Sequence, residues 1–264
     1  MTLSFRALSN ALILLTTLCS LSAVTEAANA KRGIAYALDL AQNGDAGKVA
    51  NTQISWAYDW QAFAIDSLPA GIELVPMQHD ANGINDFQNT VKNLGAKVAL
   101  GFNEPDVAAQ AHLEPADAAN LWKQGIQPLA GAGVRLGSPA VSSSPAPAGT
   151  AWLQAFLSAC DGCTVDFIAI HWYGDGADNF IAYVQDVHNQ FPNKNIWVTE
   201  FASTSTDPAA VQAFLDQTIN WLDGQAFVER YSWFVYGRSA TNGLISNLLD
   251  GSGNLNALGN AYVN

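Results

Sequence analysis

The sequence predicts an α/β fold that consists of one (β/α)₈ barrel of the TIM type. With 264 residues, 49% of them hydrophobic and 13% charged, the chain is long and apolar enough for one large domain with a full core. Short apolar or β-branched runs alternate with segments in which apolar residues recur at helical spacing. Strands that alternate with helices pair in parallel, and eight such units fit a compact barrel.

The predicted strands begin just after residue 30 and recur along the rest of the chain. They span Gly33–Tyr36, Ile54–Tyr58, Glu73–Met77, Lys97–Phe102, Arg135–Gly137, Val165–His171, Ile196–Thr199 and Tyr231–Phe234. A doubly wound open sheet is the alternative fold. That fold normally carries a glycine-rich phosphate loop after its first strand, and Gly33-Ile34-Ala35-Tyr36 lacks one, so the barrel is favoured.

Helices are predicted between the later strands. They span Asn85–Leu94, Pro115–Ala130, Ala151–Ala159, Asn179–Gln190 and Asp207–Leu222. The pair Asp207-Pro208 is typical of a helix start, because an N-cap residue precedes a proline at the first helical position. Little helical pattern follows the first two strands, so short connections are expected there.

Residues 1–30 resemble a secretory signal peptide. Arg6 is followed by the apolar run Ala11–Leu21, which is too short to span a bilayer, and Ala28-Asn29-Ala30 is a small-residue cleavage site. A buried N-terminal helix is the alternative. Residues 31–264 would then form the barrel, secreted to the extracellular space or the cell wall and without a membrane segment after cleavage.

The net charge excludes two classes of partner. Lys and Arg number 11 against 23 Asp and Glu, which gives a formal charge of −12. A chain this acidic is poorly suited to the phosphates of nucleic acid or to anionic lipid surfaces. The three Cys and four His are too scattered for a structural zinc module.

One cysteine pair remains once the predicted signal peptide is removed. Cys160 and Cys163 are separated by two residues, and in an oxidising compartment we expect them to form a disulfide. The alternative is a thioredoxin-like redox motif, in which the pair opens a helix after a strand. Here the pair follows a predicted helix and precedes a predicted strand, an order that disfavours redox chemistry.

Two glutamates end predicted strands. Glu104 follows the fourth strand and Glu200 ends the seventh, and a barrel enzyme keeps its chemistry at such strand ends. Three steps around an eight-strand ring place the two side chains across the mouth from each other. Facing carboxylates suit hydrolysis of a glycosidic bond, in which one protonates the leaving oxygen and the other attacks the anomeric carbon. A solvated or helix-capping role is the alternative for each glutamate alone.

Polar and aromatic residues accompany the two glutamates at strand ends. His171 and Tyr173 lie on one face of the sixth strand, where either can hydrogen-bond a carboxylate and set its pKa. Aromatic rings with polar rims suit sugar rings. Candidates at strand ends include Tyr36, Tyr58, Trp60 and Trp233; ordinary core packing is the alternative for all of them.

Several segments together resemble glycoside hydrolase family 128. This is the fungal-type glycosyl hydrolase catalytic core family, whose members are related to the alkali-sensitive linkage protein. The resemblance is carried in order by Ser55-Trp56, Val75-Pro76-Met77, Gly101–Asp106, Leu136–Ala140, Cys160–Gly174, Trp197–Phe201 and Tyr231–Phe234. Two departures stand out. Asp59 occupies a position where the family pattern favours Asn, and the strand Ser55–Trp60 has no Arg to hold a nucleophile.

The resemblance implies a clan A retaining endo-β-1,3-glucanase on a (β/α)₈ barrel. Glu104 would be the acid/base and Glu200 the nucleophile. Asn103 would hydrogen-bond the sugar 2-hydroxyl. The supporting residues of the site would be His171, Tyr173 and Trp233. The two carboxyl groups should then lie about 5–5.5 Å apart, and the acid/base should have a raised pKa. We expect a monomer that binds β-1,3-glucan or its oligosaccharides, with no metal or cofactor. Another β-glycan hydrolase, of the mannanase or xylanase type, and a non-hydrolysing cell-wall protein are the alternatives.

Overall fold

The computed structural model describes residues 29–264. The predicted signal peptide therefore lies almost wholly outside the described residues, and its assignment stays a prediction. Within the described part of the chain no helix is both long and apolar enough to cross a membrane. Eight strands occur there: β1 (Arg32–Tyr36), β2 (Trp56–Tyr58), β3 (Glu73–Leu74), β4 (Val98–Ala99), β5 (Arg135–Leu136), β6 (Phe167–Gly174), β7 (Asn195–Ser203) and β8 (Val228–Tyr236).

The strands pair in parallel throughout, as the alternating pattern predicted. Six of them form one sheet in the order β3-β2-β1-β8-β7-β6, and β4 pairs with β5 in a second sheet. Isolated parallel bridges connect the two sheets, from Met77 to Leu100 and from Gly137 to Phe167. The parallel α/β fold is thus confirmed, whereas a closed barrel of regular strands is not observed.

A proline explains why the predicted third strand, Glu73–Met77, is short. Pro76 stands between Val75 and Met77. A proline has no backbone N–H and cannot donate a hydrogen bond to the ladder of a sheet. The neighbouring residues keep single bonds instead, such as the N–H of Leu100 to the carbonyl of Pro76 at 2.9 Å.

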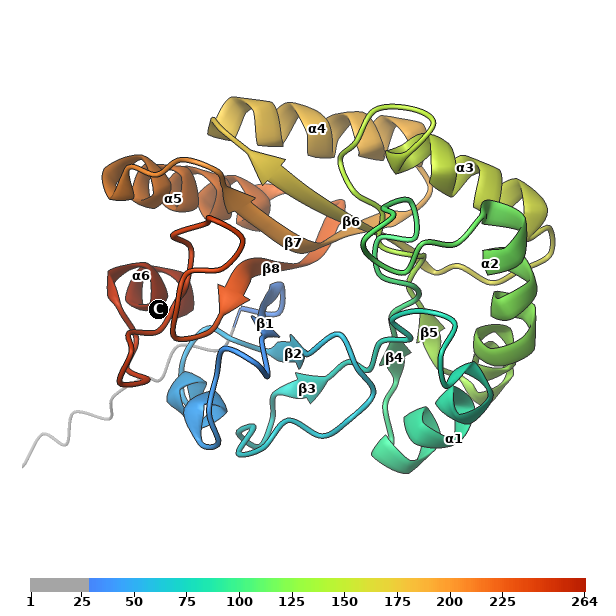
Figure 1. Cartoon of the computed structure of the whole chain (residues 1–264), viewed down its shortest axis with the longest axis horizontal. Coiled ribbons are helices and arrows are strands. Elements are labelled where there is room, and N and C mark those ends of the chain that lie inside the picture. Colours follow the sequence, from blue (N-terminus) through green and yellow to red (C-terminus); the bar gives the residue numbers. More distant parts are fainter. Residues whose placement is uncertain (1–28) are drawn as a thin grey trace, which may run out of the picture.

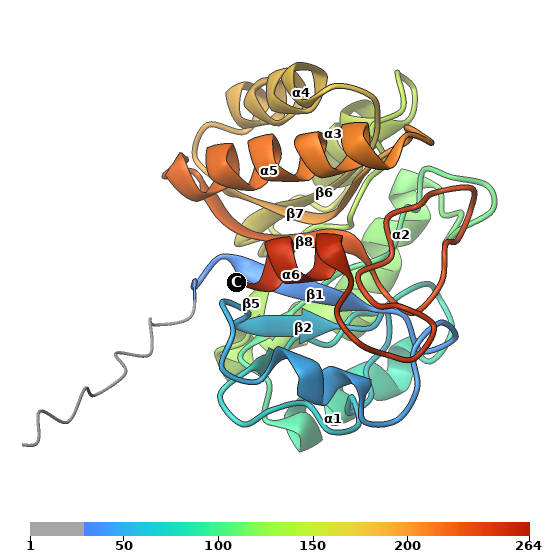
Figure 2. The same cartoon turned by 90° about the vertical axis from the view of Figure 1, so that its left-hand side faces the viewer.

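Helices lie on the outside of the strands (Figure 1). They are α1 (Ile84–Leu94), α2 (Pro115–Leu121), α3 (Gly149–Ala159), α4 (Ala177–Gln190), α5 (Pro208–Gly224) and α6 (Ala257–Val263), with a 3₁₀ segment at Asp45–Val49 after β1. The long loop between β8 and α6 extends on the side toward which the strands point (Figure 2). That side holds the candidate site.

Local sequence signals account for where the helices begin and end. Asp207 caps α5 by accepting the N–H of Ala209 at 3.0 Å, and Pro208 occupies the first turn, as predicted. The predicted helix Pro115–Ala130 is instead α2, followed by a π-helical turn at Trp122–Ile126 and a 3₁₀ segment at Gln127–Ala132. Pro128 lacks the N–H that a continuous α-helix would need there.

The interior enclosed by the strands is filled by large aromatic side chains. Phe167 stacks on Trp197 with ring centroids 4.0 Å apart, and Trp56 packs beside Trp197 at 5.2 Å. The guanidinium of Arg230 lies 4.6 Å from the Trp197 ring, a cation–π contact. A Cβ at Gly33 would lie 2.1 Å from the Trp56 ring, so only glycine permits this close approach.

The predicted disulfide between Cys160 and Cys163 is present. Their Cα atoms lie 5.4 Å apart, and the bond closes the turn between α3 and β6. It lies at the amino end of β6, whereas His171 and Tyr173 lie toward the carboxyl end of the same strand. The disulfide therefore joins structural elements away from the candidate site.

Candidate active site

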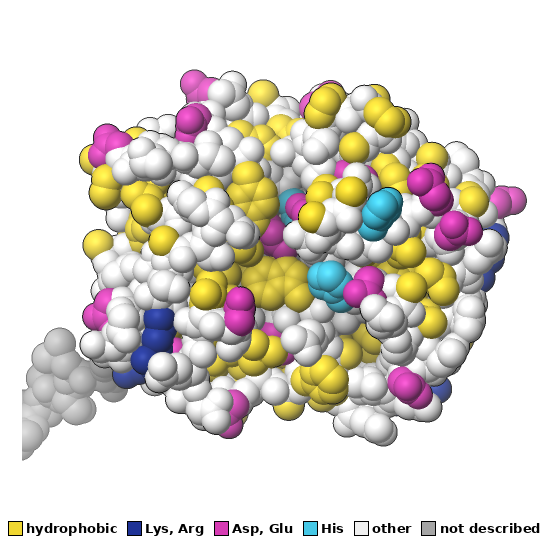
Figure 3. All heavy atoms as spheres, in the orientation of Figure 1, with side chains coloured by type: hydrophobic (Ala, Val, Ile, Leu, Met, Phe, Trp, Pro, Cys, Tyr) yellow, Lys and Arg dark blue, Asp and Glu magenta, His cyan; other side chains and the backbone are white. Residues whose placement is uncertain are grey.

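A cavity of about 560 Å³ opens at the carboxyl ends of the strands. Glu104 and Glu200 both line it, with Asn103, Trp60 and Tyr173. Figure 3 shows acidic and histidine side chains around an apolar patch near the centre of this face. The strand-end positions of the two glutamates thus bring them into one cavity, as the sequence predicted.

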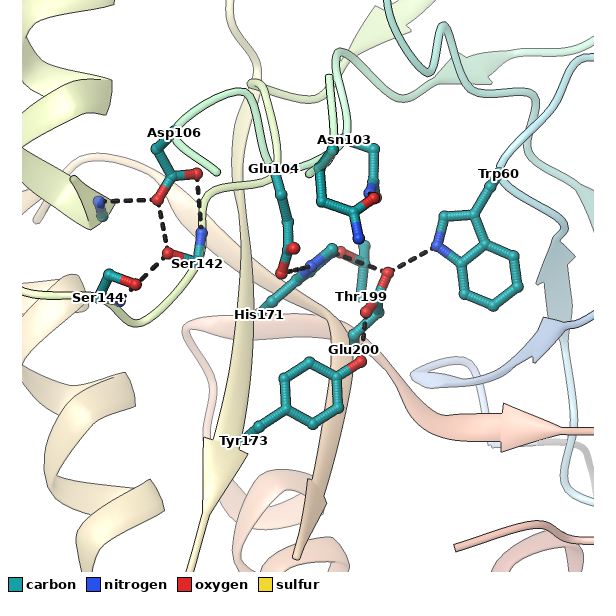
Figure 4. Close-up of polar contacts among 12 residues, drawn as sticks. Trp60, Asn103, Glu104, Asp106, Ser142, Ser144, His171, Tyr173, Thr199 and Glu200 are labelled. Carbon is teal, nitrogen blue, oxygen red and sulfur yellow. Dashed lines mark hydrogen bonds and ion pairs between the residues drawn. The ribbon is translucent and has the colours of Figure 1, made fainter. Parts of the chain in front are cut away.

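Glu104 is held on a strained stretch of backbone. Its φ is 40°, in the left-handed region that residues with a Cβ rarely adopt, and Pro105 restricts it further. The N–H of Glu104 donates to the carbonyl of Ala140 at 2.7 Å. Asp106 fastens the same loop, because its carboxylate accepts the Ser142 hydroxyl at 2.5 Å and the Gly149 N–H at 2.9 Å (Figure 4). Strain of this kind is typical of functional sites.

Glu200 is buried near the end of β7 and is held mainly by neutral donors. The indole N–H of Trp60 donates to Oε1 at 2.6 Å, and the Tyr173 hydroxyl donates to Oε2 (Figure 4). The Tyr58 hydroxyl approaches Oε1 at 3.4 Å. Burial and the Glu200 charge raise the pKa of both tyrosines well above the usual value, so both stay protonated donors. These three side chains hold the carboxylate of Glu200 where the strand Ser55–Trp60 offers no arginine to do so.

His171 lies between the two glutamates. Its Nδ1 is 2.9 Å from Oε1 of Glu104 and its Nε2 is 3.4 Å from Oε1 of Glu200. One carboxylate oxygen from each glutamate and one nitrogen of this ring all lie within 4.8 Å of one another. The imidazole is completely buried, so it contacts the carboxylates and is not open to solvent.

The charges of this group shift two pKa values. Burial opposes ionisation of Glu104, but the hydrogen bond and charge of His171 outweigh it, and the pKa of Glu104 lies below its usual value. Burial likewise opposes the charged form of His171, but the carboxylates of Glu200, Glu104 and Asp106 outweigh it and raise the pKa of the imidazole. The raised pKa expected for Glu104 from the sequence is therefore wrong, because a basic ring lies against it.

The same three residues form a group whose ligand atoms are close enough to hold a metal ion. In a metal site each residue turns one atom toward a shared centre. Here the two nitrogens of one imidazole face two different carboxylates, at 2.9 Å and 3.4 Å. Nδ1 makes a hydrogen bond with Glu104 and Nε2 makes a longer contact with Glu200, so the ring faces each carboxylate separately and does not turn one nitrogen toward a shared metal centre.

The other predicted site residues divide between the cavity and the core. The Nδ2 of Asn103 donates to Gln110 at 3.3 Å, while its buried Oδ1 has no hydrogen-bond partner in the described part of the chain. Trp60 and Tyr173 line the cavity, and Tyr58 lies buried behind it against Glu200. By contrast Tyr36 donates to the carbonyl of Gln42, and Trp233 is fully buried. Neither of these last two side chains lines the cavity.

Sequence reasoning missed several residues of the cavity wall. They are Ala37, Asp39, Leu40, His79, Gln110, Thr204, Phe234, Thr241, Asn242 and Leu244. Most lie in loops that follow strands, where no periodicity identifies them. Phe234 had a signal, since it lies in the predicted last strand, two residues before Tyr236.

Two hydrogen-bonded carboxyl groups, Glu200 buried and Glu104 partly buried, lie in one cavity at the carboxyl ends of parallel strands, which is the arrangement of a glycoside hydrolase. The family described as glycosyl hydrolase catalytic core matches residues 33–262, and the chain belongs to this family.

Similar proteins come from fungi and bacteria. Alkali-sensitive linkage protein 1 of Schizosaccharomyces pombe is 35% identical over 246 residues, which are 88% of this chain and 44% of that relative. A GH128 subgroup III curdlan-specific exo-β-1,3-glucanase from Blastomyces gilchristii is 35% identical, with a TM-score of 0.78 over 90% of this chain and 99% of that one. A GH128 subgroup I endo-β-1,3-glucanase from Amycolatopsis mediterranei, in complex with laminaritriose, is 33% identical, with a TM-score of 0.73 over 88% and 98%.

Proposed function

We propose that the protein is a secreted retaining endo-β-1,3-glucanase. Solved structures of β-1,3-glucanases resemble nearly the whole chain, and one of them holds laminaritriose. The observation that carries the proposal is the approach of the two glutamates, whose nearest carboxylate oxygens lie within 4.8 Å. Retaining enzymes hold these groups about 5–5.5 Å apart, whereas inverting enzymes leave about 6.5–9.5 Å for a water molecule.

In this proposal Glu200 is the nucleophile and Glu104 the acid/base. The donors around Glu200 from Trp60, Tyr58 and Tyr173 orient its carboxylate for attack on the anomeric carbon. Among the described residues, the Glu104 side chain makes a hydrogen bond only with His171, through Oε1, which leaves its second oxygen free to reach the glycosidic oxygen. The attack forms a covalent glycosyl-enzyme, which water hydrolyses with Glu104 as base.

Asn103 is proposed to bind a sugar hydroxyl. Asn103 lines the cavity, and its buried Oδ1 has no hydrogen-bond partner within residues 29–264. A buried acceptor without a partner is costly, and a sugar hydroxyl would satisfy it. The rings of Trp60 and Phe234, 5.9 Å apart and both in the cavity wall, would contact the faces of the sugar.

The proposal also includes a closed (β/α)₈ barrel and export. The parallel bridges from Met77 to Leu100 and from Gly137 to Phe167 support closure of the eight strands into one ring. The apolar run before residue 30 and the disulfide support a signal peptide, a catalytic unit at 31–264 and an extracellular or cell-wall location. We expect this unit to act as a monomer.

The test is incubation of the purified protein with linear β-1,3-glucan, with mannan and xylan in parallel. A series of laminari-oligosaccharides is expected from β-1,3-glucan alone. Release of glucose as the sole early product would favour exo action instead, the activity of the Blastomyces neighbour. No hydrolysis of any of the three would favour a non-hydrolysing cell-wall protein.

The roles of the glutamates are separated by azide rescue. Glu200→Ala should lose hydrolysis on every substrate, and azide should then give a glycosyl azide of inverted configuration. Glu104→Ala should still form the covalent intermediate from a dinitrophenyl glycoside, whose leaving group needs no proton, and azide should rescue it with retained configuration. Glu114→Ala, at an exposed residue before α2, is the matched control. Swapped stereochemistry would reverse the two roles.

A further inference from the structure

His171 contacts both proposed catalytic carboxylates through one ring. It lies on β6, paired with Glu200 in the neighbouring strand β7, so the backbone ladder fixes the spacing of the two side chains. Its Nδ1 faces Glu104 at 2.9 Å and its Nε2 faces Glu200 at 3.4 Å. Nδ1 makes a hydrogen bond with Glu104, whereas the buried Nε2 makes only a longer ion-pair contact with Glu200 and has no hydrogen-bond partner among the described residues. A positive charge on the ring is attracted by both carboxylates.

The charged groups around this ring are mostly acidic. Glu104 and Asp106 approach from the loop after β4, Glu200 from β7, and His79 from the loop after β3. Tyr58 on β2 and Tyr173 on β6 face Glu200 as neutral donors. No Lys or Arg is among the described residues that line the cavity. His171 is thus the group placed to carry a positive charge between the two glutamates.

We propose that His171 stores the catalytic proton and returns it to Glu104 when Glu200 becomes an ester. This inference rests on the proposed retaining mechanism. It assigns His171 a positioning and proton-holding role that acts through Glu104, since the buried ring does not reach substrate.

The steps balance over one turnover. In the resting enzyme His171 is an imidazolium and both glutamates are carboxylates. As Glu200 bonds to the anomeric carbon and the glycosidic C–O bond breaks, Nδ1 of His171 gives its proton to Glu104, and Glu104 gives a proton to the leaving oxygen. His171 is then neutral and Glu104 is a carboxylate, ready to act as base. Water next attacks, Glu104 takes its proton, Glu200 is released as a carboxylate, and the proton returns to His171.

The electrostatics support this cycle. Glu200 is foremost among the charges that raise the pKa of His171 against the effect of burial. Ester formation removes that charge, so the imidazole binds its proton less tightly when the leaving group needs it. The lowered pKa of Glu104 agrees, because the resting proton then belongs to the ring and not to the carboxyl group.

The direct test is ¹⁵N NMR of histidine in the wild-type protein, before and after trapping with a 2-deoxy-2-fluoro-laminaribiosyl fluoride. The chain has four histidines, so the signal of His171 is assigned by comparison with His171→Asn. We expect an imidazolium in the free enzyme and a neutral ring in the trapped ester. An adduct in which His171 stays protonated, or a neutral ring in the free enzyme, would overturn the inference alone. Failure to form any covalent adduct would overturn the retaining mechanism and this inference together.

Kinetics give an independent readout. His171→Asn keeps a donor toward Glu104 but cannot hold the extra proton. Hydrolysis of a dinitrophenyl glycoside should change little in the glycosylation step, whereas β-1,3-glucan hydrolysis should fall by about 100-fold to 10 000-fold, the range of general acid catalysis. His188→Asn, at a ring stacked on Phe227 away from the cavity, should leave both rates near wild type. Equal losses on the two substrates would show a merely structural role.

Discussion

Asp59 is buried beside the cavity, and only 2% of this residue is exposed to solvent. Oδ1 accepts the N–H of Gln61 at 3.1 Å, but Oδ2 has no partner among the described residues. Burial therefore raises the pKa of Asp59 from 3.8 to about 6, against the opposing effect of the backbone N–H of Gln61.

The sign and size of the stability effect follow. The folded protein binds this proton more tightly than the unfolded chain, so stability is highest below pH 3.8 and declines as the pH rises toward about 6. At about 1.36 kcal/mol per pKa unit, the loss is about 3 kcal/mol. Asp59→Asn keeps the shape and the Oδ1 acceptor but carries no charge, so it should escape this loss.

The assay is thermal unfolding of wild type and Asp59→Asn at pH 4 and pH 7.5. The advantage of the variant should be larger at pH 7.5 by about 2.4 kcal/mol, since part of the effect is already lost at pH 4, or roughly 5–10 °C in Tm for a domain of this size. Asp39→Asn removes an exposed carboxylate from the same hollow and controls for the change in net charge. An equal difference between wild type and Asp59→Asn at both pH values would refute the reasoning.

Two further predictions concern packing and the disulfide. Gly33→Ala should destabilise the fold by about 1–3 kcal/mol because the new Cβ meets the Trp56 ring. The matched control is Gly131→Ala, whose new Cβ meets nothing within 4 Å. Equal Tm values for the two variants would contradict the packing argument. Thiol titration of the native protein without residues 1–30 should detect no free cysteine, and reduction of Cys160–Cys163 should lower Tm while kcat stays unchanged. A rate that switches reversibly with reductant would instead support redox control.

Sequence patterns predicted which segments form strands better than they predicted where each strand ends. The segment Ile196–Thr199 was predicted as a strand, and β7 runs from Asn195 to Ser203. The extension includes Glu200 and Ser203, polar residues at which an apolar pattern stops. They continue the ladder because β6 pairs with them, which only the tertiary structure shows. The helix predicted at Pro115–Ala130 is shorter than expected, since its last part, which contains Pro128, is a 3₁₀ segment and not α-helix.

The candidate site was partly predictable for the same kind of reason. The ends of parallel strands meet at one edge, so Glu104, Glu200, His171 and Tyr173 could be grouped from the sequence alone. Which face of a strand a residue occupies was less predictable. Register shifts between Ile34 and Tyr36, and between Val198 and Phe201, change the alternation of side chains near the strand ends. Tyr36 and Trp233, each next to such a shift, lie in the core although the sequence predicted them at the site.

The left-handed backbone at Glu104 has a consequence for natural selection. A residue with a Cβ in this conformation costs about 1–2 kcal/mol, and glycine there would not. Under the mechanism proposed above, position 104 is one at which stability and activity compete, since the backbone disfavours the side chain that the chemistry needs. Selection for a stable fold alone would favour replacement of this glutamate, and selection for the proposed hydrolysis would keep it. A lineage without the second pressure would lose the proposed acid/base and gain stability.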